Sequence, residues 1–190
     1  MEKLKISSIA VCVAALFNIT VAVAADNVYT ETVNGLEWTY RVVNGEAVLG
    51  GNNNARTIDT STFGAITIPD TLGGYPVRGI GGCAFQDCTA LTLITLPINL
   101  RYISNDAFRN CSGLMMMSVP DGVKSISARG FYDCGNMTKI VLPNSITNIE
   151  HEAFRNCGNL KNVNIPANLT TIADRVFQGC QYPFWALYGG

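Results

Sequence analysis

Residues 106–114 read DAFRNCSGL and residues 152–160 read EAFRNCGNL, so the chain contains nearly the same phrase twice. The phenylalanine of this phrase recurs every 23 residues, at Phe85, Phe108, Phe131, Phe154 and Phe177. A cysteine follows three residues after each phenylalanine, and four prolines keep the same interval: Pro97, Pro120, Pro143 and Pro166. Three residue types that stay in phase over several periods indicate a tandem repeat, so the rest of the sequence is interpreted against that period.

Each repeat has the form A-F-x-x-C-x-x-L-x-x-I-x-L-P-x-x-V-x-x-I. The alternation in Ile140-Val141-Leu142 predicts a short β-strand whose side chains point alternately inward and outward. Pro143 ends this strand, because proline donates no hydrogen bond to the ladder. The second apolar pair, such as Ile146 with Ile149, predicts the return side of the same coil. One repeat has too many apolar residues to bury by itself, so stacked repeats must bury them together.

The motifs I-x-L-P, V-x-x-I and A-F-x-x-C-x-x-L resemble the BspA-like leucine-rich repeats, a 23-residue variety of this repeat. The resemblance covers residues 58–180. It implies a β-rich solenoid, namely a right-handed leucine-rich-repeat coil with a parallel β-sheet. It also implies a binding or adhesion module that recognises a protein, an envelope component or the extracellular matrix. The family has no catalytic motif to transfer, so we expect no enzyme activity and no cofactor.

Residues 1–24 predict a secretory signal peptide. They begin with the basic MEKLK, continue through an apolar stretch, and end with small residues that favour cleavage after Ala24 or Ala25. An N-terminal membrane anchor is the alternative, although the interrupted stretch is short for the ~20 residues that span a bilayer. We therefore expect an exported protein, secreted or at the cell surface, with no membrane span in the mature chain.

The segment before the repeats predicts a cap. Alternating runs around Asn44-Gly45 predict a β-hairpin over residues 36–49, since Asn-Gly favours a two-residue hairpin turn. Residues 25–57 would then cover the open N-terminal end of the solenoid, where core and strand edge are otherwise exposed. Three apolar residues after this cap fit the core positions of a first coil: Phe63, Ile66 and Ile68.

An insertion and a degenerate end depart from the repeat. Gly73-Gly74-Tyr75-Pro76 lies in a turn that lengthens one coil, and this turn is either a tolerated insertion or a means of presenting Tyr75 to a partner. Residues 181–190 predict a degenerate terminal coil, with Trp185 on its strand. Because no further cap follows in the sequence, we expect this end to allow self-association.

Six cysteines remain after the signal peptide, and five of them occupy one repeat position. Stacked coils would place these five about 4.8 Å apart with parallel side chains, which is unfavourable for disulfide geometry, so we expect buried free thiols. Cys83 differs because its repeat equivalents are all charged: Asp106, Arg129, Glu152 and Arg175. This pattern predicts a solvent-facing thiol that either pairs between molecules or stays unpaired. Cys83 and Cys88 predict no metal site, since they face opposite ways and no second pair exists.

The outward residues of successive strands form two ladders on one surface of the predicted sheet. We expect this surface to bind the ligand, because it exposes apolar groups on a regular sheet. The candidate site residues are Leu93, Thr95, Met116, Ser118, Lys139, Val141, Asn162, Asn164 and Trp185. The alternative interpretation is that they are neutral surface residues or sites of weak self-association.

Composition and motifs argue against several other functions. Charged residues are only 14% of the chain and the basic residues are scattered, so we expect no nucleic-acid partner. The single histidine, His151, falls at a variable repeat position, and no nucleophile or carboxylate pair recurs in register. The rival hypothesis is a structural or envelope-assembly protein that self-associates without a specific ligand.

Overall fold

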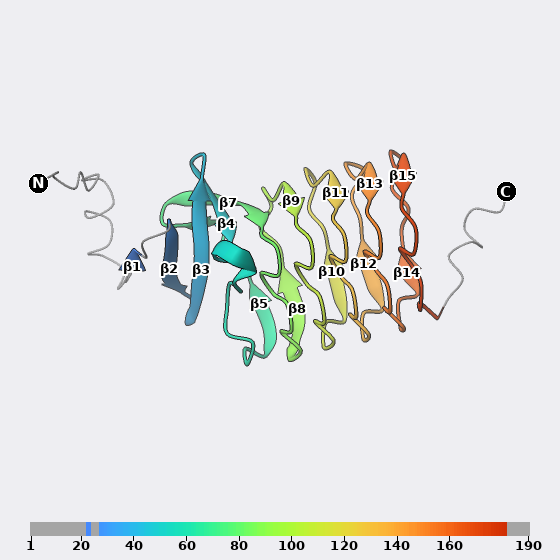
Figure 1. Ribbon diagram of the computed structural model, residues 1–190, viewed down its shortest axis with the longest axis horizontal. Coiled ribbons are helices and arrows are strands. Elements are labelled where there is room, and N and C mark those ends of the chain that lie inside the picture. Colours follow the sequence, from blue (N-terminus) through green and yellow to red (C-terminus); the bar gives the residue numbers. More distant parts are fainter. Residues whose placement is uncertain (1–21, 24–26, 182–190) are drawn as a thin grey trace, which may run out of the picture.

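The computed structural model describes residues 22–23 and 27–181 as a β-solenoid, in which successive turns of the chain stack along one axis (Figure 1). In this part of the chain there is no α-helix, and the short 3-10 turn η2 spans Asn52–Asn54. Each regular coil contributes one strand to each of two sheets. The solenoid with parallel strands that the repeat predicts is therefore confirmed.

The first sheet contains the strands that end in the I-x-L-P motif. They are β5 (Gly64–Thr67), β8 (Leu91–Thr95), β10 (Met116–Ser118), β12 (Lys139–Val141) and β14 (Asn162–Val163). All neighbours are parallel, in the order β14-β12-β10-β8-β5. We call the outward surface of these five strands the strand face.

The second sheet contains the return strands of the coils. They are β7 (Tyr75–Ile80), β9 (Tyr102–Ile103), β11 (Ser125–Ile126), β13 (Asn148–Ile149) and β15 (Thr171–Ile172), and they pair in parallel. The V-x-x-I motif supplies their inward residues, as the sequence predicts: Ile126 and Ile149 are both fully buried.

Antiparallel strands extend the second sheet at its N-terminal end. They are β1 (Ala22–Val23), β2 (Val28–Val33), β3 (Leu36–Val43) and β4 (Glu46–Leu49), and β4 then pairs in parallel with β7. The hairpin expected over residues 36–49 is present, and Asn44 and Gly45 both have the positive φ that its turn requires. A similar turn at Asn34-Gly35 adds β2, which the sequence analysis did not predict.

The insertion forms a small hairpin that contacts this cap. β6 (Thr71–Leu72) pairs antiparallel with β7 across Gly73-Gly74. The N–H of Gly73 donates a hydrogen bond to the buried carboxylate of Glu31 in β2. A Cβ atom on Gly73 would collide with the hydroxyl of Tyr40 in β3. The insertion therefore ties the first coil to the cap, while the contact role of the exposed Tyr75 stays a prediction.

A stack of phenylalanine rings runs through the core. Neighbouring centroids are 5.1–5.6 Å apart and the planes are nearly parallel, in the order Phe85, Phe108, Phe131, Phe154 and Phe177. Trp38 of the cap packs edge-on against Phe85 at 6.5 Å and closes the stack at its N-terminal end. Aromatic contacts of these two kinds are favourable beyond the apolar area that they bury.

The cysteines form a second stack beside the phenylalanines. All are free thiols, as the sequence predicts; Cys180 is half-buried and four are buried: Cys88, Cys111, Cys134 and Cys157. The thiol of Cys111 donates a hydrogen bond of 3.1 Å to the carbonyl of Phe85 in the preceding coil, and the three later cysteines repeat this contact. Cysteine at this position therefore fills space in the core and also satisfies a buried main-chain carbonyl.

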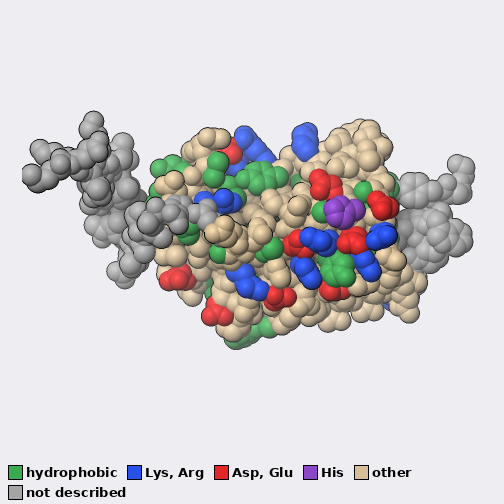
Figure 2. Space-filling model, viewed as in Figure 1, with side chains coloured by type: hydrophobic (Ala, Val, Ile, Leu, Met, Phe, Trp, Pro, Cys, Tyr) green, Lys and Arg blue, Asp and Glu red, His purple; other side chains and the backbone are tan. Residues whose placement is uncertain are grey.

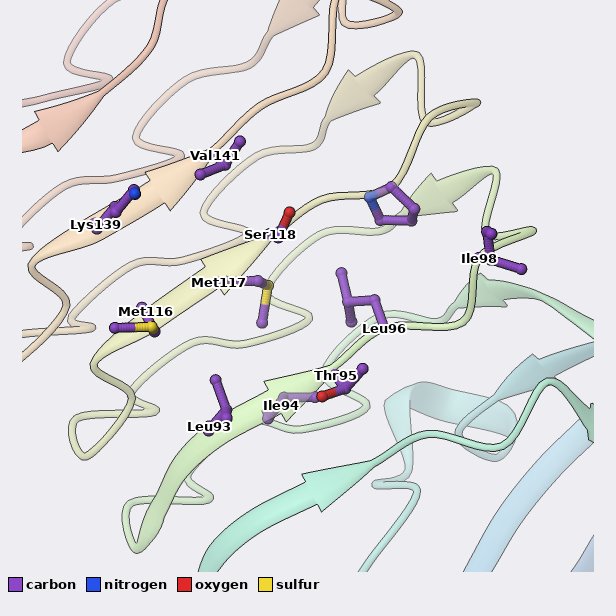
Figure 3. A pocket seen from close by; sticks show the side chains of 11 residues that line it. Leu93, Ile94, Thr95, Leu96, Ile98, Met116, Met117, Ser118, Lys139 and Val141 are labelled. Carbon is purple, nitrogen blue, oxygen red and sulfur yellow. The ribbon is translucent and has the colours of Figure 1, made fainter.

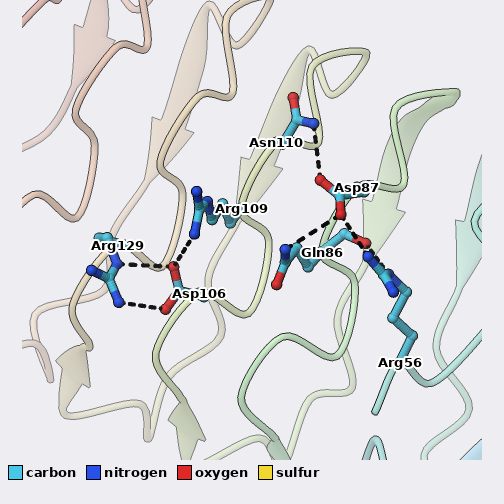
Figure 4. Close-up of polar contacts among 7 residues, drawn as sticks. All are labelled: Arg56, Gln86, Asp87, Asp106, Arg109, Asn110 and Arg129. Carbon is cyan, nitrogen blue, oxygen red and sulfur yellow. Dashed lines mark hydrogen bonds and ion pairs between the residues drawn. The ribbon is translucent and has the colours of Figure 1, made fainter. Parts of the chain in front are cut away.

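The turns that carry the phenylalanines form a third side of the solenoid, which we call the turn face. One repeat position on this face carries charges that alternate in sign along the stack, in the order Asp106, Arg129, Glu152, Arg175. Asp106 accepts two hydrogen bonds of 2.9 Å from Arg129 and lies 3.6 Å from Arg109 (Figure 4). Figure 2 shows acidic and basic side chains gathered over the C-terminal half of the solenoid.

A second ladder on the turn face alternates aspartate with asparagine. The amide of Asn110 donates to Asp87 at 2.9 Å, and the amide of Asn156 donates to Asp133 at 2.8 Å (Figure 4 shows the first pair). A neutral amide between carboxylates keeps like charges off adjacent coils. Both alternations have a period of two coils, which explains why DAFRNCSGL and EAFRNCGNL resemble each other more than either resembles the coil between them.

The structure corrects one predicted core residue of the first coil. Ile66 and Ile68 are buried as expected, but Phe63 is 80% exposed. Gly64 has a φ of +79° and pairs with Leu91, and the register shifts between Gly64 and Ala65. Gly64 therefore lies opposite the leucine that Phe63 was expected to match, and Phe63 falls outside the strand. Most of the predicted signal peptide, and the predicted terminal coil from residue 182 onward, lie outside the described residues.

Candidate functional site

The strand face brings most of the predicted site residues together. Met116 pairs with Leu93 on one side and with Lys139 on the other, and Lys139 pairs with Asn162. The second ladder contains Thr95, Ser118 and Val141, which lie two residues further along the same three strands. Trp185, the last predicted member, lies outside the described residues.

A shallow depression of about 460 Å³ lies between β8, β10 and β12 (Figure 3). Six predicted residues line it: Leu93, Thr95, Met116, Ser118, Lys139 and Val141. The side chains at its surface are markedly exposed for apolar groups, since Met116 is 49% exposed and Leu93 is 38% exposed. An apolar hollow on a rigid sheet is the kind of surface that excludes water well when a partner covers it.

Lys139 gives the depression its electrostatic character. It is the only charged residue within the five described strands of this sheet, and no ion pair joins it to an acidic side chain in the described part of the chain. A lysine on an apolar surface attracts a carboxylate on an approaching ligand and disfavours a cation.

The two asparagines at the C-terminal side lie outside this depression. Asn162 is exposed at the start of β14. The side-chain amide of Asn164 both accepts a hydrogen bond from the N–H of Leu142 and donates one to its carbonyl. Asn164 thus replaces a main-chain ladder contact, so its amide is already engaged with the protein itself.

Five lining residues were not among the candidates: Ile94, Leu96 and Met117 are buried core residues, and the other two lie at the rim. Ile98 and Pro120 line the corner just beyond the strands, and Ile98 is 72% exposed. The ladders were built only from residues within strands, so this corner was not considered. Comparison of repeat equivalents could have found Ile98, because it is a large apolar residue where the later coils have polar or small ones: Asp121, Asn144 and Ala167.

The second predicted site, Cys83, occupies a corner of the turn face. Its φ is +58°, and the equivalent charged residues share this conformation. Cys83 is half-buried, and Asp106 at the equivalent position of the next coil is 7% exposed. Charged residues at this repeat position predicted full exposure to solvent, but the position is partly covered. Desolvation, with a smaller contribution from Asp106, raises the pKa of the Cys83 thiol.

We expect iodoacetamide at pH 8 to alkylate Cys83 before the cysteines of the stack. Burial raises the pKa of Cys88 to about 11 and that of Cys180 to about 12, and it raises the pKa of Cys111 further. A pKa of about 11 leaves roughly one thiol in a thousand ionised at pH 8, and that fraction grows only at higher pH. Peptide mapping of the native and the urea-unfolded protein measures each site, and equal rates for Cys111 and Cys83 in the native protein would contradict the buried stack.

The repeat also decides the family. The sequence profile of the BspA type leucine rich repeat region matches residues 56–183 in six copies. The chain belongs to the BspA-type leucine-rich-repeat family. Repeats of this class typically mediate protein interactions, because stacked coils present an extended, regular surface.

Solved structures of other proteins, among them bacterial leucine-rich-repeat proteins, have the same fold. A leucine-rich-repeat protein of T. pallidum is 27% identical with a TM-score of 0.63, and the match covers 76% of each chain. One from Bacteroides ovatus is 26% identical with a TM-score of 0.61, over 78% of this chain and 44% of that one. The pneumococcal vaccine antigen PcpA shares the fold at 20% identity and a TM-score of 0.53, over 74% of this chain and 38% of its own.

No curated protein matches this BspA-type sequence. Within residues 22–23 and 27–181, no helix is long and apolar enough to cross a membrane. The family assignment establishes a leucine-rich-repeat protein and names no partner.

Proposed function

We propose that the protein is an exported binding module that recognises a protein ligand through the depression on its strand face. The observation that carries this proposal is the group of exposed apolar side chains on three adjacent strands of a rigid sheet. The ligand is a protein or an envelope or extracellular-matrix component, and the protein acts by adhesion rather than by catalysis.

The chemistry of the depression supports a particular type of contact. Leu93, Met116 and Ile98 offer apolar area, while Thr95 and Ser118 offer hydroxyl groups at the edge. Lys139 adds one positive charge, and none of the ion pairs among the described residues includes it. This combination fits an apolar segment of a partner with an acidic residue beside it.

The N-terminal sequence supports export. A basic start, an apolar stretch and small residues before Ala24 are the signals of a secretory signal peptide. Cleavage there would release a chain that begins at the cap. N-terminal sequencing of the protein from the extracellular or envelope fraction tests this part, and an intact N-terminus in that fraction would contradict it.

We expect the double change Leu93→Ser with Met116→Ser to weaken partner binding by about tenfold or more, because buried apolar anchors at an interface are worth about 2 kcal/mol or more together. Stability should change by less than about 1 kcal/mol, since both side chains already face solvent. Immobilised mature protein captures partners from extracellular and envelope extracts, and the retained amounts are compared between variants.

The matched control is Val43→Ser, which removes a 43% exposed apolar side chain from the cap. It should leave capture unchanged. Equal capture by the double variant and the unaltered protein would overturn the placement of the site. Light scattering of the purified protein tests the rival function. Self-association that increases with protein concentration and persists in the double variant would favour a self-assembling envelope protein.

A further inference from the structure

Three consecutive methionines, Met115, Met116 and Met117, have very different surroundings. Met115 is 47% exposed and Met116 is 49% exposed, whereas Met117 is only 2% exposed. Along β10, successive side chains point to opposite faces of the sheet, so Met116 faces outward and Met117 faces inward, whereas Met115 lies just before the strand. The chain thus presents two thioether groups to solvent and buries an identical third one directly beside them.

Met116 lines the depression of the proposed contact surface, and Met115 directly precedes it in the chain. Met116 lies between Leu93 and Lys139 in the depression, and Met117 forms part of its floor (Figure 3). Main-chain hydrogen bonds hold Met115 from both sides, since its N–H donates to Thr92 and its carbonyl accepts from Thr138. The backbone of Met115 is therefore tied to both neighbouring coils, Met116 is the first residue of β10, and about half of each side chain is exposed.

We propose that Met115 and Met116 form an oxidation site through which a peroxide changes the polarity of the strand face. The sulfide sulfur takes one oxygen atom from the peroxide and is oxidised by two electrons to a sulfoxide. The peroxide O–O bond breaks, and with hydrogen peroxide the other product is water. A sulfoxide at Met116 places a polar S=O group among the apolar side chains of the depression.

The surroundings of the other methionines make this change local. Met117 and Met137 are buried in the core, so the peroxide does not reach them while the protein stays folded. Oxidation of a core methionine would disrupt the fold. The exposed Met115 and Met116 lie outside the core, so their oxidation leaves the fold intact. The effect of oxidation on partner binding rests on the proposed function, whereas the oxidation site itself does not.

Peptide mapping by tandem mass spectrometry tests the site on the mature protein. Brief treatment with dilute hydrogen peroxide should oxidise Met115 and Met116 about tenfold or more faster than Met117 and Met137, which serve as internal controls. Circular dichroism should stay unchanged during this phase. Equal rates at Met116 and Met117 would overturn the proposal, whether or not any partner binds the strand face.

Anilinonaphthalene sulfonate, an anionic fluorescent dye that binds exposed apolar surface, measures the change in polarity. Oxidation should lower the amount of dye bound, and methionine sulfoxide reductases of both epimer specificities should restore it. The variant Met115→Leu with Met116→Leu should bind the dye and lose none after peroxide treatment. Dye binding that falls equally in this variant would show that oxidation acts elsewhere and would overturn the assignment.

Discussion

The change Phe131→Ala is expected to lower the free energy of unfolding by about 3–5 kcal/mol, since it leaves a large cavity in the core. Phe131 is fully buried, and its ring stacks on Phe108 at 5.1 Å and on Phe154 at 5.3 Å. Removing this ring breaks both contacts and interrupts the phenylalanine stack in the middle. Rigid neighbouring coils cannot collapse into the gap, because hydrogen bonds on three sides fix their spacing.

Urea unfolding followed by circular dichroism measures this loss. The sequence offers a matched control in Phe63→Ala, because Phe63 is 80% exposed. That change should cost less than about 0.5 kcal/mol, as is usual for a surface substitution. A loss of similar size in both variants would show that Phe63 is packed in the core after all. A loss below about 1 kcal/mol for Phe131→Ala would contradict the continuous stack.

We expect Arg129→Glu to lower the free energy of unfolding by about 2–3 kcal/mol. Arg129 donates two hydrogen bonds to Asp106, whose side chain is only 11% exposed, and that pairing is the main reason why the pKa of Arg129 is raised. The substitution removes the main partner of a poorly solvated carboxylate. It also places a third carboxylate between Asp106 and Glu152 in the stack.

The control for this prediction is Arg129→Gln, which removes the positive charge and adds no negative charge. It should cost about 1 kcal/mol, since the guanidinium is 40% exposed and Asp106 keeps Arg109 nearby. Added salt should narrow the difference between the two variants, because it screens the repulsion of partly exposed carboxylates. Equal stability of the two variants at low salt would mean that the charge alternation does not stabilise the stack.

Much of the fold could be predicted because a repeat states its core positions several times. Phe85, Cys88 and Leu91 are buried in one coil, and their equivalents are buried in the next three coils. The strands and their parallel pairing follow from the same positions. The exception, Phe63, belongs to the coil where the phase is broken, so the alignment there had no second copy to test it against.

The candidate site was predictable in position and not in shape. Strand alternation placed Leu93, Met116 and Lys139 on one outward ladder, and the structure pairs them in that order. The depression and its corner residue Ile98 depend on where the chain turns after Pro97, which the alternation does not describe. Its role in binding stays a prediction that the serine variants test.

The sequence by itself determined the 23-residue period, the inward and outward positions, and the Asn-Gly hairpin, since all of these depend on neighbours along the chain. Only the tertiary structure decided which side chains meet across coils. It paired Asp106 with Arg129, set Glu31 against Gly73 of the insertion, and directed four cysteine thiols at phenylalanine carbonyls of the preceding coils. The physical reason is that such contacts depend on the spacing and angle between stacked turns, which arise from packing and have no signature in any single repeat.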